Sequence, residues 1–414
     1  MAIELSSITF TEQDDIVPES GVEEILNTGI ANSLAGNDKI TGNGIYNYGT
    51  INTGNGIDTI TGNSTVDSIF NFAGIYNVGG TINTGTGNDI IIGTGYNYGI
   101  YNFGGTINTG TGSDIITVTS TGIVGIYNDG GIIDTGDGND TITVANDGGT
   151  NGISNLGTIN TGDGNDLINS IGGPGNVGIY NSGTINTGDD NDTITGTGTS
   201  NSYGIINFDT INTGNGSDII TGTTASLGAY GIYNSGGTID TGAGNDIITG
   251  TSNSYGIYNT GIINTGDGSD TITGTSITLS YGIYNDNTID TGAGNDIITN
   301  TSNSYGIYNN GTIDTGNGED SIIADGGFNG TGNVFLGNGT DYLKGFGSGN
   351  FNGGNGKDTV ELTPGSYTVG IFETTVNFIK GSTIMETSDF EILIAGNTTY
   401  RIRNLTEGQT IFVA

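Results

Sequence analysis

Isoleucine recurs at fixed distances from an aspartate in a repeat of about 26 residues that occupies most of the chain. Between Gly44 and Ile323 eleven copies follow one another, and the copy GIYNSGTINTGDDNDTITG at Gly178–Gly196 is typical. In every copy one isoleucine stands two residues after the aspartate and another stands seven residues before it. A fixed period of this length is typical of a solenoid, in which each repeat forms one coil and stacks on the next.

Each repeat contains three short apolar segments, GIYN, TI(N/D)T and DxIT, separated by glycine-rich turns. Because β-branched residues dominate these segments and no 3.6-residue period is present, they are predicted to be strands. One coil cannot bury its apolar face alone, and stacking in register would fill the interior with columns of isoleucine. The predicted fold is therefore all-β: a three-sided parallel β-solenoid with a C-terminal β cap.

The pattern divides the chain into four parts. Residues 1–35 are predicted to cap the N-terminal end, and residues 36–323 to form the eleven-repeat solenoid. Residues 324–361 are predicted to form shorter coils, since the spacing between aspartates falls to 21 and then to 17. Residues 362–414 lose the repeat and are predicted to form the C-terminal β cap. Caps are expected because open solenoid ends expose strand edges that would aggregate.

Charge and composition narrow the function classes. The chain carries 43 acidic and six basic residues, a net charge of −37, which disfavours nucleic acid and anionic membrane surfaces and favours cations. It has no cysteine and no histidine, which excludes disulfides, thiol catalysis and histidine-based zinc or acid–base sites. No run approaches the ~18 apolar residues of a membrane-spanning helix, so no membrane insertion is expected. The start MAIELSSITFTEQDD has no basic and apolar stretch, so no cleavable N-terminal signal is expected.

The turn T-G-x-G-x-D carries the candidate chemistry. Its two glycines allow positive φ and let carbonyl groups turn inward, and its aspartate adds a carboxylate. Calcium takes six to eight oxygen ligands of these kinds, more than one turn supplies, so two stacked turns are expected to share an ion. The candidate calcium ligands are Asp58, Asp89, Asp114, Asp140, Asp166, Asp192, Asp218, Asp246, Asp270, Asp296, Asp320, Asp341 and Asp358.

These turns resemble the nonapeptide G-G-x-G-x-D-x-apolar-x of the hemolysin-type, or repeats-in-toxin (RTX), calcium-binding family. The best matches are Gly353–Glu361 and Leu336–Lys344. The resemblance implies rows of calcium ions (Ca2+) held by turn carbonyls and aspartates, and export by type I machinery through an uncleaved C-terminal signal, here ending in IFVA. The chain departs from the family by having one motif per coil and Thr for the first glycine in all eleven repeats. Asp190 replaces a further glycine, so calcium is least expected at Asp192.

A metal-free alternative stays open, because Gly, Asn and Asp also form ordinary tight turns. Electrostatics favours the metal. Carboxylates in register at the strand spacing of ~4.8 Å would repel one another by about 1 kcal/mol in water and by more in a protein. No Lys or Arg lies between Ile40 and Leu343 to offset that repulsion.

The repeat also predicts three rows of side chains. The Tyr of GIYN recurs in nine copies, with Ser154 and Ile206 in the other two, and is expected to face outward, either for cross-strand stacking or for contact with sugars or another molecule of the chain. The next residue is Asn in all eleven copies, which predicts a hydrogen-bonded Asn ladder. A partial row of Thr three residues after the aspartate resembles the flat faces of ice-binding β-solenoids, although the neighbouring positions are irregular.

The sequence therefore predicts a secreted calcium-binding β-solenoid with a structural or adhesive role at the cell surface or in extracellular matrix, whose folding calcium drives after export. Besides calcium, the candidate partners are cell-surface polysaccharide and other copies of the chain, and the latter give a self-assembling filament or sheath as the alternative. An ice-binding protein and a polysaccharide-modifying enzyme are weaker alternatives. No enzyme is expected, because the repeats lack the Arg, Lys or His that such a lyase or epimerase site needs.

Overall fold

The computed structural model describes residues 2–18, 23–64, 73–278, 280–302 and 305–414. The chain forms two compact units: unit 1 (Met1–Asn215 and Ile219–Ala225) and unit 2 (Gly216–Asp218 and Ser226–Ala414). Each unit is a parallel β-solenoid with three short strand segments per coil, which confirms the predicted all-β fold. Helix is limited, in the described residues, to two 3-10 turns, η1 (Leu5–Ser7) and η2 (Ile402–Asn404), and no helix there is long and apolar enough to cross a membrane.

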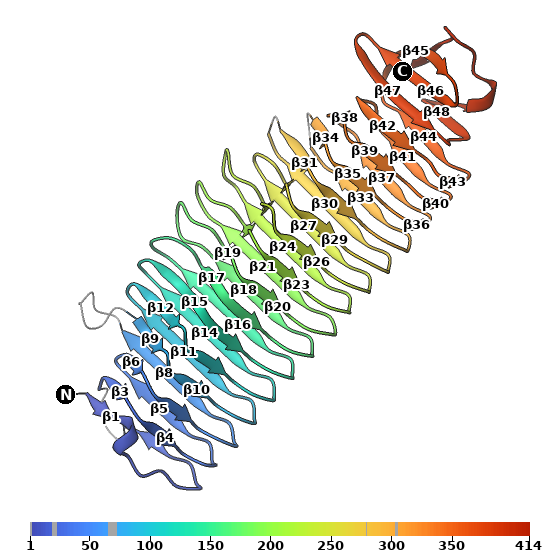
Figure 1. Cartoon of the computed structure of the whole chain (residues 1–414). Coiled ribbons are helices and arrows are strands. Elements are labelled where there is room, and N and C mark those ends of the chain that lie inside the picture. The colour runs from blue at the N-terminus through green and yellow to red at the C-terminus, as the bar shows by residue number, and fades with distance from the viewer. Residues whose placement is uncertain (1, 19–22, 65–72, 279, 303–304) are drawn as a thin grey trace. The chain divides into compact units, whose positions relative to one another are not determined.

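In unit 1, strands of successive coils lie side by side in three rows (Figure 1); the first two rows, which β15 and β17 join, belong to one sheet, and the third row belongs to another. Each row is called a face below. The tyrosine face, formed by the GIYN segments, comprises β1 (Ile3–Glu4), β3 (Ile25–Asn27), β6 (Ile45–Asn47), β9 (Ala73–Val78), β12 (Tyr98–Phe103), β15 (Val124–Asp134), β17 (Ile153–Asn160), β19 (Ile179–Asn181) and β22 (Ile205–Asn207). The TIN face comprises the ends of β15 and β17 together with β4 (Ile30–Asn32), β7 (Thr50–Asn52), β10 (Thr81–Asn83), β13 (Thr106–Asn108), β20 (Thr184–Asn186) and β23 (Thr210–Asn212). The threonine face, which follows the aspartate, comprises β2 (Ile16–Val17), β5 (Lys39–Gly42), β8 (Thr59–Ser64), β11 (Ile90–Gly95), β14 (Ile115–Ser120), β16 (Thr141–Asn146), β18 (Leu167–Ile171), β21 (Thr193–Gly198) and β24 (Ile219–Thr224).

Unit 2 repeats the same three faces. Its tyrosine face comprises β25 (Ile232–Asn234), β28 (Ile257–Asn259), β31 (Tyr281–Asn285), β34 (Tyr305–Asn309) and β38 (Phe328–Asn329). Its TIN face comprises β26 (Thr238–Asp240), β29 (Ile262–Asn264), β32 (Thr288–Asp290), β35 (Thr312–Asp314), β39 (Asn333–Phe335) and β42 (Gly349–Asn352). Its threonine face comprises β27 (Ile247–Ser252), β30 (Thr271–Ser276), β33 (Ile297–Asn300), β37 (Ser321–Ala324), β41 (Tyr342–Lys344), β44 (Thr359–Leu362) and β48 (Ile392–Ala395). The turns of its shorter coils pair as β36 (Asn317–Gly318), β40 (Asn338–Gly339) and β43 (Asn355–Gly356).

The core is built from the three isoleucine columns that the repeat predicts. Equivalent residues pair in register from coil to coil, as Ile75 does with Ile100 and Ile100 with Ile126. In all eleven copies the isoleucine of GIYN and the two isoleucines flanking the turn are at most 1% exposed. Since full burial of an isoleucine contributes roughly 1.5–3 kcal/mol, these columns supply the main stabilisation of each unit.

Beside the isoleucines runs the predicted Asn ladder, which is confirmed. The Nδ2 of Asn77 donates to Oδ1 of Asn102, and Asn102 donates to Asn128, both at 2.8 Å; the same bond joins Asn259 to Asn285 in unit 2. These side chains are buried, and they also donate to backbone carbonyls: Asn102 donates to Gly105 of its own coil and to Ile132 of the next coil, and Asn259 donates to Thr288 of the next coil. An amide can close such a ladder by itself because it carries both a donor and an acceptor.

The tyrosines of GIYN alternate with the buried isoleucine and asparagine and are half-buried on the outer surface, as predicted. In unit 2 the rings of Tyr258 and Tyr284 lie 4.2 Å apart at 6°, and those of Tyr284 and Tyr308 lie 4.5 Å apart at 3°. Such stacked pairs add about 0.5–1.5 kcal/mol each beyond their buried area. The predicted cross-strand stacking is therefore present.

The ends of the chain depart from the repeat. Inside the segment predicted as the N-terminal cap, β1 already pairs in parallel with β3, and residues 19–22 of that segment lie outside the described residues. From Gly365 onward antiparallel pairing joins β45 (Gly365–Phe372), β46 (Thr375–Lys380), β47 (Thr383–Ser388), β49 (Thr398–Arg401) and β50 (Thr410–Val413) to the solenoid. The terminal IFVA lies in and after β50, with Ile411 and Val413 buried against the cap.

Candidate metal centre: a row of buried aspartates

The two glycines of the turn are required by the backbone. Gly110 and Gly112 have φ of +96° and +140°, a region that other residues rarely adopt. A Cβ on Gly112 would lie 1.5 Å from the carbonyl oxygen of Gly87 in the preceding coil. The glycine pair therefore allows neighbouring turns to stack in direct contact.

All thirteen predicted aspartates end such a turn, and all are at most 2% exposed. In twelve of them Oδ1 accepts a hydrogen bond, 2.7–2.9 Å long, from the backbone N–H of the equivalent aspartate in the preceding coil. For example, Asp114 N–H donates to Asp140, and Asp140 N–H donates to Asp166. The predicted residues thus form a ladder inside the turn edge of each unit.

The ladder has two further members that the sequence did not assign. The N–H of Asp15 donates to Oδ1 of Asp38, whose own N–H donates to Asp58. At the other end the N–H of Asp358 donates to Oε2 of Glu391, at 2.7 Å. The turn-like AGND at Ala35–Asp38 signals the first of these members. No sequence motif surrounds Glu391, which only the cap brings beside the last turn.

The second carboxylate oxygen, Oδ2, has a different environment from Oδ1. It is buried and has no hydrogen-bond partner, within the described part of the chain, in Asp58, Asp89, Asp114, Asp140, Asp166, Asp270, Asp296, Asp320, Asp341 and Asp358. The hydroxyl of the threonine five residues earlier lies close enough to the carboxylate to lower the pKa of the aspartate in most coils, as Thr84 does for Asp89. In some coils this hydroxyl donates to a backbone carbonyl of the next coil: Thr84 Oγ1 donates to the carbonyl of Thr109, at 3.1 Å. In one coil Thr241 does donate to Oδ2 of Asp246, at 2.7 Å.

This burial shifts the titration of the carboxyl groups. It raises the pKa of Asp89, Asp140, Asp270 and Asp320 to about 7, because an ionised group loses hydration there; the backbone N–H and the neighbouring threonine lower the pKa only partly. Burial raises the pKa of Asp166 and Asp358 to about 6, and also raises it at Asp58, Asp114, Asp246, Asp296 and Asp341. These rungs therefore favour binding a proton or a cation.

The same turns offer carbonyl oxygens as further ligands. In at least eight turns the carbonyl of the second glycine accepts no hydrogen bond among the described residues: Gly56, Gly87, Gly112, Gly138, Gly164, Gly244, Gly268 and Gly294. No group of three or more acidic side chains converges anywhere in the described ranges. A calcium ion at this edge would therefore need carbonyl oxygens of the turns besides the aspartates, and carboxylate and carbonyl oxygens are the donors that calcium prefers.

The turn with Asp190 is the exception predicted from the sequence. Asp190 occupies the place of the second glycine and has φ of +83°, unlike the +137° of Gly164 and the +158° of Gly216 in the neighbouring turns. The rung itself survives, because Asp192 still accepts the N–H of Asp166, at 2.8 Å. Weaker calcium binding at Asp192 stays a prediction.

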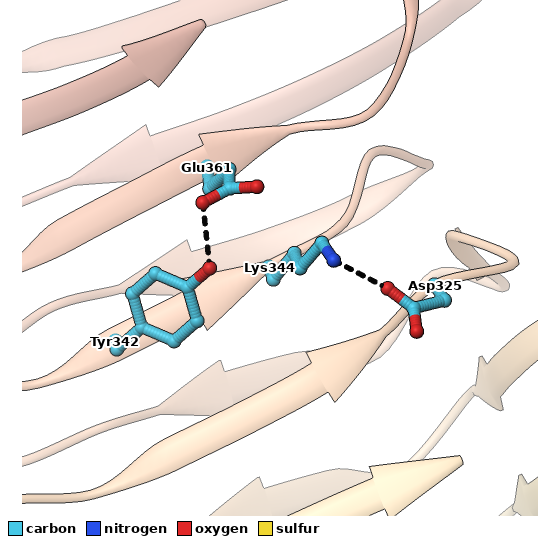
Figure 2. Close-up of polar contacts among 4 residues, drawn as sticks. All are labelled: Asp325, Tyr342, Lys344 and Glu361. Carbon is cyan, nitrogen blue, oxygen red and sulfur yellow. Dashed lines mark hydrogen bonds and ion pairs between the residues drawn. The ribbon is translucent and has the colours of Figure 1, made fainter. Parts of the chain in front are cut away.

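On the threonine face of unit 2 the outward positions change in the shorter coils (Figure 2). Lys344 Nζ lies 2.7 Å from Oδ1 of Asp325, and the hydroxyl of Tyr342 donates to Oε2 of Glu361, at 2.7 Å. These contacts replace the threonines of the longer coils, so the regular surface ends here.

Comparison with known proteins assigns no family. No family model matches the chain, and no curated protein matches it. Among solved structures it is similar to "a hyperactive, Ca2+-dependent, beta-helical antifreeze protein from an Antarctic bacterium", with 19% identity over 96% of this chain and 95% of that chain and a TM-score of 0.43. Membership of the RTX family therefore stays a prediction from the turn motif.

Proposed function

We propose that the protein is a calcium-binding β-solenoid that is exported and serves outside the cell as a structural or adhesive element, with calcium driving its folding. The observation that carries this proposal is the row of buried aspartates in which one carboxylate oxygen has no partner. Leaving such an oxygen charged and unpaired inside a protein costs several kcal/mol (roughly 1–3 kcal/mol even for a neutral group). A bound cation removes that cost at every rung.

The Asn ladder provides an internal comparison. If the turns needed only a side-chain oxygen to accept the neighbouring backbone N–H, the uncharged amide oxygen of asparagine would serve there; in the ladder of the tyrosine face that oxygen accepts the side-chain amide of the preceding coil. Aspartate is present instead at all thirteen positions, in a chain with no Lys or Arg between Ile40 and Leu343. The retained charge supports a role for a cation, and the carbonyl-rich turns support calcium.

Calcium would be held by the aspartate Oδ2 atoms together with glycine carbonyls of the turns. The ion would supply positive charge that neutralises the row of aspartates, and by coordinating oxygens of successive turns it would link neighbouring coils. In a cytosol poor in calcium the uncompensated charges oppose folding, and outside the cell calcium removes this obstacle. This order of events fits export of an unfolded chain.

Replacing one rung tests the proposal. Asp140→Asn keeps the acceptor for Asp114 but removes the buried charge, so we expect a higher melting temperature than the parent without calcium and a smaller rise when calcium is added. Asp137→Asn is the matched control, because Asp137 lies in the same turn but is exposed. Thermal melts with and without chelator measure both effects. A parent and an Asp140→Asn variant that respond equally to calcium would contradict the proposal.

The threonine face supports ice binding as a second candidate function. In unit 2 two outward columns of threonine run in register: Thr249 pairs with Thr273, Thr251 pairs with Thr275, and Thr273 pairs with Thr299. In unit 1 the same columns are interrupted by Ile92, Asn169, Ala145 and Ile171. A flat regular array of hydroxyl and methyl groups can order water, and the strand spacing of ~4.8 Å sets its period.

Thermal hysteresis measures this second function directly. We expect a solution of the calcium-loaded parent to freeze below the temperature at which its ice melts. We expect Thr273→Tyr to reduce this temperature difference by at least half, because the ring interrupts both columns. Thr288→Tyr, on the outward side of the TIN face, is the control. A parent without thermal hysteresis would eliminate ice binding and leave the calcium proposal unchanged.

A further inference from the structure

The stacked tyrosines of unit 1 are interrupted at one coil. The rings of Tyr76, Tyr101 and Tyr127 lie 5.1 and 5.3 Å apart at interplanar angles of 15° and 22°. The next coil has Ser154 in register with Tyr127, and the coil after it has Tyr180 in register with Ser154. One ring is therefore missing from the row, with a tyrosine on either side.

A second aromatic row, three residues earlier in each repeat, is interrupted at the same place. It has Tyr98 in one coil, then Val124, Asn151 and Val177, and tyrosine again at Tyr203. Because both rows are interrupted over the same coils, the side chains leave an open cavity of about 520 Å³. We call it the tyrosine-gap groove, and its lining includes Tyr98, Asn151, Tyr127, Ser154, Tyr180 and Tyr203.

The floor of the groove carries polar groups that are available to a ligand. Ser154 is 6% exposed and lies in the lining of the groove, where its hydroxyl can meet a ligand. The side-chain amide of Asn151 makes no hydrogen bond with the described part of the chain. Polar groups that face an open groove are hydrated, so a ligand hydroxyl exchanges water for a direct hydrogen bond there, which favours a ligand with hydroxyl groups at these positions.

The dimensions suit one six-membered ring. Residues two coils apart lie about 9–10 Å apart at the strand spacing of ~4.8 Å. A ring seated between Tyr127 and Tyr180 would then stack on each tyrosine at a centroid distance of about 5 Å, within the range of aromatic stacking. A sugar ring offers an apolar C–H face for the tyrosines and hydroxyl groups for Ser154 and Asn151.

The negative charge of the chain disfavours acidic sugars as ligands of the groove. No basic residue lines the groove, and Asp129 accepts a hydrogen bond from the hydroxyl of Tyr127, at 3.3 Å. With a net charge of −37 the chain repels uronic acids and sulfated glycans. We propose that the tyrosine-gap groove binds a sugar unit of a neutral polysaccharide. This inference rests on the adhesive role proposed above and gives it a site, but it does not depend on calcium coordination.

Native affinity electrophoresis tests the groove. The folded protein, in calcium-containing buffer, is run through gels containing dextran, laminarin or hydroxyethyl cellulose, with anionic hyaluronan as the charge control. We expect at least one neutral polymer, and not hyaluronan, to retard the parent. Ser154→Tyr restores the ring that the repeat provides elsewhere, so we expect it to fold and to bind at least tenfold more weakly. Tyr127→Ala should lose binding to a similar degree, and Tyr258→Ala, in the uninterrupted row of unit 2, should retain it.

Three outcomes would overturn the inference: no retardation by any of the three neutral polymers, undiminished binding by Ser154→Tyr, or retardation by hyaluronan alone. Sedimentation velocity of the parent and of Ser154→Tyr can give a fourth such outcome. If the parent is a dimer and the substitution dissociates it, the groove is an interface between copies of the chain. Circular dichroism during calcium titration reports separately on the calcium proposal. A calcium-indifferent protein that still binds dextran would contradict only that proposal.

Discussion

Protein stripped of calcium at pH 7.5 is expected to lose most of its β-sheet signal, and millimolar calcium is expected to restore it. The reason is the number of identical sites: ten or more buried carboxylates without a second partner stand in register, and each ion bound at a hundred times its Kd adds about 2.7 kcal/mol. Typical domains are stable by only about 5–15 kcal/mol, so a few ions decide whether the coils stack.

Far-UV circular dichroism during a calcium titration, with a thermal melt at each end, measures this transition. Magnesium at the same ionic strength is the control, since it keeps its water ligands and demands octahedral geometry that these turns do not impose. A protein that is fully folded in chelator and melts at the same temperature with calcium would contradict the prediction. The aspartates would then serve only to stabilise the turns.

The stability of the metal-free protein is expected to fall as the pH rises from 4 to 8, and calcium is expected to reverse this trend. In the unfolded chain an aspartate titrates near pH 3.9, whereas burial raises the pKa of Asp89, Asp140 and Asp270 to about 7. The folded state therefore binds more protons between these values, and its stability is highest below about pH 4 and declines as the pH rises to about 7. Calcium binds the ionised carboxylates, so its contribution increases over the same range.

Thermal melts at pH 5 and pH 8, each in chelator and in calcium, compare the stability of the protein under four conditions. In chelator we expect a cooperative melt at pH 5 and little remaining β-sheet signal at pH 8, and in calcium we expect the higher melting temperature at pH 8. Asp137→Asn should follow the parent, because that carboxylate is exposed. Equal pH dependence with and without calcium would show that the buried aspartates are not the groups that calcium binds.

Both expectations follow from one property of the ladder. Oδ1 is satisfied by the backbone of the preceding coil, which fixes the orientation of the carboxylate, and Oδ2 is left for a proton or a metal ion. Thr241, which donates to Asp246, shows how a metal-free turn can satisfy this oxygen locally. The competition among proton, threonine hydroxyl and cation is what the two experiments separate.

The sequence by itself determined the repeat, the strand positions and the interior columns. These features depend on residues a few positions apart: isoleucine at fixed offsets from the aspartate, glycine where φ is positive, and asparagine after each tyrosine. Each such rule is local and recurs eleven times, so the register of one coil on the next follows from matching identical patterns. For the same reason the spacing along the chain is enough to select the thirteen aspartates as candidate ligands.

The tertiary structure decided which atoms remain free. Stacking buried the carboxylates, assigned Oδ1 of each to a backbone N–H one coil away, and brought Glu391 beside Asp358 although 33 residues separate them. It also placed Ser154 between Tyr127 and Tyr180, so that a single departure from the repeat became a groove with aromatic sides. Such outcomes depend on contacts between residues that are distant in sequence, and the spacing of motifs along the chain does not encode the direction in which a side-chain oxygen points.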